Sequence, residues 1–135
     1  MWKCELVQGA DLDVAEVAAL YHASTLGERR PVGDTARFTD MVRNANLVAV
    51  ARIDDRLVGI ARSVSDFAYV TYLSDMAVDL EFQQQGIGRD LIAKTREAAP
   101  RAKVVLLAAP AAEGYYPHVG FRQHDSAWVL DPLVS

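Results

Sequence analysis

Hydrophobic and polar positions follow two different periods along this chain. In some segments apolar residues recur at helical spacing, and in others they form short continuous runs rich in Val, Ile, Leu and Tyr. Continuous runs of this length and composition are typical of strands that are largely buried in a sheet. The pattern therefore predicts strands over residues 2–7, 47–53, 57–64, 69–78 and 103–108.

Helical spacing appears between these strands. A first helix is expected after the turn at residues 8–11, with Asp11 or Asp13 as its cap, and a second is expected to be capped by Thr35. A third follows the polar loop after residue 78 and stops at Pro100, because proline lacks the N–H that would continue it.

The last third of the chain predicts a short helix over residues 110–118 and a hairpin that opens at 120–121, with a second strand over 127–130. The complete order is β-α-α-β-β-β-α-β-α-β-β. The strand–loop–helix–strand unit near the middle requires one parallel pair, and the hairpins on either side are antiparallel. We therefore expect a single α+β domain over residues 1–135, with a mixed, mostly antiparallel sheet flanked by helices.

Composition narrows the function. The net charge of −4 disfavours nucleic acid as the main partner, because no basic field attracts phosphate chains. A single cysteine, Cys4, excludes an internal disulfide, and the three histidines are too scattered for a metal site. No apolar run approaches the roughly 18 residues that a membrane-spanning helix needs. The N-terminus lacks a signal-peptide pattern, so a cytoplasmic location is the expectation.

A polar loop with two glycines lies directly before the third predicted helix. Its sequence, Gln83-Gln84-Gln85-Gly86-Ile87-Gly88, precedes a helix start, where unpaired N–H groups bind phosphate. A dinucleotide fingerprint fails because Leu91 stands where a third glycine is needed. A nucleotide P-loop fails because Arg89-Asp90 replace its Lys and Ser or Thr. A tight turn without a ligand remains an alternative to a pyrophosphate site.

A second motif lies after the next strand. Residues 112–121 read Ala-Glu-Gly-Tyr-Tyr-Pro-His-Val-Gly-Phe, and together with the glycine loop they resemble the GNAT acetyltransferase superfamily. That family has an Arg/Gln-x-x-Gly-x-Gly/Ala loop followed by an aromatic-Tyr-x-x-x-Gly-Phe segment. The strand end Met76-Ala77-Val78 also resembles the family pattern, and the likeness extends from Trp2 to about Leu130.

The resemblance implies an acetyl-CoA site. Main-chain groups of Met76 and Val78 would pair with the pantetheine arm where the long strand bulges and splays from the next one. Loop amides, with Arg89 as a cation, would hold the pyrophosphate. The implied cofactor-binding residues are Met76, Ala77, Val78, Gln83, Gln84, Gln85, Gly86, Ile87, Gly88 and Arg89.

Two residues are candidates for the chemistry. Tyr116 matches the family tyrosine near the thioester sulfur, and a phenol there can protonate the departing thiolate. Asp75 is the first candidate for a base that takes a proton from the amine, although it is equally suited to fixing the strand end. Glu113 and His118 flank Tyr116, and proton transfer through water would need no base at all.

The leading hypothesis is therefore an N-acetyltransferase that moves acetyl from acetyl-CoA to a primary amine by direct attack in a ternary complex. A catalytically silent acyl-CoA-binding module is the alternative. The expected acceptor is a small-molecule or peptide amine, contacted by variable loops that include residues 27–34. Arg29-Arg30 in that loop suits either an anionic part of the acceptor or a solvated charge pair. A homodimer that uses the C-terminal strands is also open.

Overall fold

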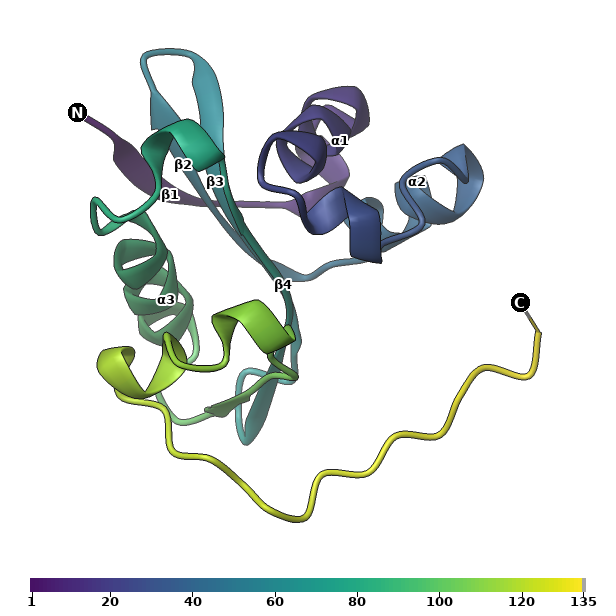
Figure 1. The fold of residues 1–135 in the computed structure, drawn as a ribbon, viewed down its shortest axis with the longest axis vertical. Coiled ribbons are helices and arrows are strands. Elements are labelled where there is room, and N and C mark those ends of the chain that lie inside the picture. Colours follow the sequence, from purple (N-terminus) through teal and green to yellow (C-terminus); the bar gives the residue numbers. More distant parts are fainter. Residues whose placement is uncertain (135) are drawn as a thin grey trace.

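The computed structural model, which describes residues 1–134, contains one five-stranded sheet with helices on both faces (Figure 1). The strands lie side by side in chain order, and every neighbouring pair is antiparallel except the last, β4 with β5. This confirms the α+β class and the mixed, mostly antiparallel sheet. The strands are β1 (Lys3–Val7), β2 (Leu47–Ile53), β3 (Arg56–Ser65), β4 (Val70–Val78) and β5 (Lys103–Val105).

The helices α1 (Val14–Ala23), α2 (Thr35–Arg43) and α3 (Ile87–Ala98) occupy the expected places. Asp13 caps α1 by accepting hydrogen bonds from the N–H groups of Ala15 and Glu16. Asp34, and not Thr35, caps α2, since its carboxylate accepts the Arg37 N–H. No helix in residues 1–134 has both the length and the apolar character needed to cross a bilayer.

Two hydrophobic cores lie on opposite faces of the sheet. Helices α1 and α2 pack on one face, where Val48 and Val50 of β2 point, and α3 packs on the other, where Ala49 and Ala51 point (Figure 1). Adjacent residues of a strand point to opposite faces, so the one apolar run of β2 serves both cores. The small alanines on the α3 face leave room for that helix to pack close to the sheet.

Strand β4 contains the irregularity that shapes the site. Asp75 pairs with Arg62 of β3, but Leu73 pairs with Ser63, so Ser74 is an extra residue in a β-bulge. The bulge reverses the alternation of side chains. Leu73 therefore belongs to the core under α3, whereas Asp75 points to the side of α1 and α2.

The end of the chain departs from the sequence-based expectation. Strand β5 ends at Val105, and the helix expected over 110–118 is two short 3₁₀ turns, Pro110–Ala112 and Tyr116–Val119. The predicted last hairpin with a strand over 127–130 is wrong for this chain alone. Residues 122–134 run away from the domain without a strand among them (Figure 1). The apolar run over 127–130 has the composition of a strand, but a strand forms only where another strand pairs with it.

A buried carboxylate ties both helices of one face to the bulge. One oxygen of Asp75 accepts the Arg30 Nε at 2.5 Å, and the other accepts the Tyr21 hydroxyl at 2.6 Å and the Arg62 Nε at 2.8 Å. The Arg62 guanidinium also donates to the Met41 carbonyl of α2 and to the Ser74 hydroxyl of β4, both at 3.0 Å. The network thus joins α1, α2, β3, β4 and the loop after α1.

Asp75→Asn should lower the free energy of unfolding by about 3–5 kcal/mol at neutral pH, because two cations lose a buried partner. Burial alone would raise the pKa of the Asp75 carboxyl, but Arg62, Tyr21 and Arg30 together hold it below its usual value. A lowered pKa makes the stabilisation complete above the unfolded value of about 3.9 and removes it as the pH falls through the folded value. Urea unfolding at pH 7 and at lower pH should therefore show the two proteins converging in acid.

Asp40→Asn, at an exposed carboxylate of α2, is the matched control and should change stability by less than about 0.5 kcal/mol. The same acid dependence in Asp75→Asn as in the unaltered protein would show that another carboxylate is responsible.

Candidate functional site

A cleft opens where β4 and β5 part. The two strands pair only from Val70 with Lys103 to Tyr72 with Val105, while β4 continues to Val78. This is the splay that the resemblance implies. The space between them holds a cavity of about 70 Å³, whose lining includes Leu73, Ser74 and Met76 of β4, Leu106 and Leu107 after β5, and Tyr116.

The main chain of the second half of β4 faces this cleft. The Asp79 N–H donates to the Val58 carbonyl of β3, so strand alternation turns the Met76 and Val78 groups to the opposite edge, which β5 has left. At the end of the strand the Val78 carbonyl accepts the side-chain amide of Gln83 at 2.9 Å. Gln83 thus fastens the glycine loop to the strand, a role that its place in the motif did not indicate.

The loop before α3 is open to solvent. Gln84 has a φ of 63° and Gly86 a φ of 105°, so two left-handed residues turn the chain sharply into the helix. The first intrahelical bond is from the Asp90 N–H to the Gly86 carbonyl, and no side chain caps the helix. The N–H groups of Ile87, Gly88 and Arg89 therefore have no acceptor within α3, and the helix dipole favours an anion there.

Packing holds this helix start against the sheet. The Ile87 side chain is buried, and a Cβ on Gly59 of β3 would lie 2.8 Å from it. Glycine at 59 thus allows α3 to begin directly over β3, at the end of the cleft away from β5. The apolar residue inside the motif fixes the position of the polar loop around it.

Tyr116 begins the second 3₁₀ turn and lines the cavity together with Met76. Its ring makes edge-to-face contacts with Tyr115 and Phe121, with centroids 5.4 Å away in each case. Burial, and secondarily the neighbouring Tyr115, raises the pKa of the Tyr116 hydroxyl. A tyrosine hydroxyl is protonated at neutral pH with or without this rise, so the group can donate a proton from the cavity wall.

Tyr115 is a site residue that sequence reasoning passed over. Its hydroxyl lies so close to Gly88 that a Cβ there would be 2.7 Å from it. Tyr115 and Tyr116 therefore contact the two ends of the same cleft, the helix start and the cavity. The family pattern singles out Tyr116 of the two adjacent tyrosines, and only the fold shows that the Tyr115 hydroxyl lies against Gly88.

Asp75 does not fit the role of a base. It is 1% exposed, both of its oxygens accept hydrogen bonds, and its pKa is lowered as described above. The geometry favours the alternative given for it, fixing the strand. Sequence reasoning missed its partners Tyr21, Arg30 and Arg62, since nothing local connects them.

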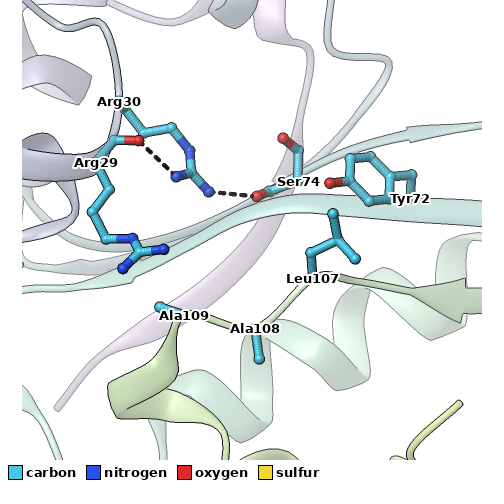
Figure 2. A pocket seen from close by; sticks show the side chains of 7 residues that line it. All are labelled: Arg29, Arg30, Tyr72, Ser74, Leu107, Ala108 and Ala109. Carbon is cyan, nitrogen blue, oxygen red and sulfur yellow. Dashed lines mark hydrogen bonds between the residues drawn. The ribbon is translucent and has the colours of Figure 1, made fainter. Parts of the chain in front are cut away.

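A larger cavity, of about 310 Å³, adjoins the first (Figure 2). Arg29 and Arg30 enter it from the loop after α1, Tyr72 and Ser74 from β4, and residues 107–109 from the segment after β5. Arg30, Ser74, Leu107 and Ala109 line both cavities, so the two spaces are adjacent and share part of their walls.

Solved structures share this fold over nearly the whole chain. An acetyltransferase of the GNAT family from Streptococcus pneumoniae is 21% identical with a TM-score of 0.75, and the match covers 98% of this chain and 100% of that one. An aminoglycoside acetyltransferase from an uncultured soil metagenomic sample is also 21% identical with a TM-score of 0.75, and the match covers 99% of this chain and 97% of that one. An aminoglycoside N-acetyltransferase in complex with CoA is 14% identical with a TM-score of 0.72, and the match covers 98% of this chain and 95% of that one.

No match was found among curated protein sequences. A family model described as an acetyltransferase (GNAT) domain matches residues 30–131, which is more than half of the chain and includes both sequence motifs. Because that match coincides with a splayed strand pair and an uncapped helix start of the expected kind, the chain belongs to the GNAT acetyltransferase family.

Proposed function

We propose that this protein is an N-acetyltransferase that transfers acetyl from acetyl-CoA to a primary amine by direct attack in a ternary complex. One observation carries the proposal: Gly88 of the uncapped, exposed helix start lies against Met76, which lines the same small cavity as Tyr116. An anion-binding group and a proton donor are the two things that a CoA thioester requires of a protein. A related structure was solved with CoA, which supports the same co-substrate here.

The residues present fit acetyl-CoA. The amides of Ile87, Gly88 and Arg89, with the loop residues Gln84, Gln85 and Gly86 before them, would bind the diphosphate, and the Arg89 side chain adds a positive charge. Met76 and Val78 would offer main-chain groups to the pantetheine amides, as in pairing with another strand. The Ala77 side chain, between them, packs in the core under α1 and α2. It would contribute only by keeping the alternation that turns the main-chain groups of Met76 and Val78 toward the cleft.

The chemistry then follows from the cleft. The amine nitrogen attacks the thioester carbonyl, the carbon–sulfur bond breaks, and the departing thiolate takes a proton from Tyr116. The oxyanion that forms in between would be met by a main-chain N–H, for which Val78 is the candidate. Because Asp75 is held in ion pairs, water in the open cavity would take the protons that the amine nitrogen loses, and one of them would return to the Tyr116 phenolate. Holding both reactants in one cleft supplies much of the remaining acceleration.

A catalytically silent acyl-CoA-binding module is the alternative. It predicts cofactor binding without turnover and no special role for a phenol. The place of Tyr116 on the cavity wall favours the enzyme, because a phenol there can donate a proton to a leaving thiolate and binding alone does not need one.

Tyr116→Phe should lower kcat by roughly 10²–10⁴-fold while the Kd for acetyl-CoA changes little, because the hydroxyl acts on the leaving thiolate. Thiol release in the presence of a panel of amines measures turnover, and calorimetry measures acetyl-CoA binding. Tyr69→Phe, at an exposed tyrosine on the turn before β4, is the matched control and should keep full activity. Unchanged turnover in Tyr116→Phe would favour a different proton donor, and binding without any turnover would favour the silent module.

The homodimer also remains a proposal, supported by the C-terminal segment of residues 122–134. Trp128 is 93% exposed, Leu130 99% and Leu133 104%, in an extended chain that contacts no strand. Strand β5 lies at the end of the sheet with one edge unpaired, next to the exposed side chains of Val105 and Leu107. Pairing of this segment with β5 of a second copy would cover both.

Removing residues 124–135 should convert a dimer into a monomer in light-scattering measurements of molar mass. Leu130→Lys, which keeps the length of the segment, should weaken the dimer in the same direction because it places a charge where an apolar side chain is expected to be buried. Met1→Lys, at a side chain that is 97% exposed, is the control for an added charge. A monomeric full-length chain at all concentrations would contradict the proposal.

A further inference from the structure

We infer that the acceptor is a small primary amine that also carries a carboxylate, and that Arg29 binds this carboxylate in the larger cavity. The inference rests on the proposed acetyl transfer and goes beyond it by naming the acceptor class. It depends on the charge of the cavity walls and on the lining residues that this cavity shares with the smaller one beside Tyr116.

The cavity is positively charged although the protein as a whole is acidic. Arg29 and Arg30 line it, and Arg62 lies directly behind in the buried network. Asp75 is the single carboxylate in this group, so three positive charges face one negative charge. No acidic side chain lines either cavity in residues 1–134.

The two lining arginines are held differently. Arg30 is fixed: it donates to Asp75, to the Ser74 carbonyl at 3.1 Å and to the Arg29 carbonyl at 2.9 Å. Arg29 forms no ion pair with any residue in the described part of the chain, and its side chain extends toward Ala109 across the cavity (Figure 2). Its guanidinium is therefore the group available to bind an anion, with the planar fork that suits a carboxylate.

The guanidinium of a surface arginine is usually surrounded by water, but the Arg29 side chain lines a cavity and faces its opposite wall. The main chain and small side chains of residues 107–109 lie opposite, and the Tyr72 and Ser74 side chains close a third side. Partial enclosure weakens screening by solvent, so the positive potential acts on whatever enters. This positive potential favours the binding of an acidic ligand and disfavours the binding of polycationic amines.

Size and position agree with this assignment. A volume of 310 Å³ is about that of ten water molecules, which suits an amino acid or a group of similar size. Since Ser74 and Leu107 line both cavities, an acceptor whose carboxylate contacts Arg29 can extend its amine toward the thioester position beside Tyr116.

Matched acceptors test the inference. Thiol release from acetyl-CoA is measured with an amino acid, its amide and the corresponding decarboxylated amine, together with spermidine and an aminoglycoside. We expect kcat/KM to be at least tenfold higher for the acid than for either partner that lacks the carboxylate. The amide has the more readily deprotonated amine, so a preference for the acid cannot come from amine reactivity. A higher kcat/KM for the amide, for spermidine or for the aminoglycoside would overturn the inference and leave acetyl transfer intact.

Arg29→Gln should reduce the ratio of acid to amide kcat/KM by tenfold or more, chiefly through KM of the acid. Arg29→Glu should reverse the preference toward cationic amines. Arg101→Gln, at an exposed arginine after α3 that lines neither cavity, should keep the original ratio. An unchanged ratio in Arg29→Gln would show that another group selects the acceptor.

A binding measurement distinguishes failure of the acidic subsite from failure of the proposed acetyl transfer. Calorimetry with CoA present compares an N-acetyl amino acid with its amide, on the unaltered protein and on Arg29→Gln, and needs no turnover. Tighter binding of the acid that is lost in Arg29→Gln supports the acidic subsite even if no amine releases thiol, in which case only acetyl transfer fails. Equal binding of acid and amide overturns the subsite whatever the turnover.

Discussion

The Asp75 carboxylate, held between Arg30 and Arg62, is the interaction on which the site depends. The bulge at Ser74 turns this side chain toward α1 and α2, and once buried the carboxylate needs cationic partners to offset its lost hydration. One partner comes from β3 and the other from the loop after α1. The same ion pairs therefore fix the splayed strand and bring a loop that is distant in sequence to the mouth of the cleft.

The two ends of the cleft beside β4 are therefore lined by different groups. The main chain of β4 beyond the bulge faces an edge that β5 has left, and the helix start at Ile87 lies at its far end. Arginine side chains collect at the near end, around the larger cavity. A chain of net charge −4 thus places positive potential at both ends of its cleft, from main-chain N–H groups at one and from guanidinium groups at the other.

Sequence patterns were reliable where the signal was local. The runs that became β2, β3 and β4 and the left-handed glycine turn before α3 follow from short-range periodicity or spacing. Tyr116, which lines the cavity, was singled out by the family resemblance. The last hairpin was wrong because the apolar run over 127–130 indicates a strand without supplying its partner. The helix expected over 110–118 became two 3₁₀ turns, because Pro117 interrupts regular helical bonding there.

The sequence by itself predicted the fold family, a phosphate-binding loop from Gln83 to Arg89 and Tyr116 as the proton donor, the last through its resemblance to the GNAT motif. Each of these predictions rests on a few residues that are adjacent in the sequence and whose conformational preferences are short-range. Only the tertiary structure decided that Asp75 is a buried anchor, that Tyr115 faces Gly88 and that Arg29 faces a cavity. Those facts depend on contacts between distant segments, and a one-residue bulge is enough to change which side chains meet.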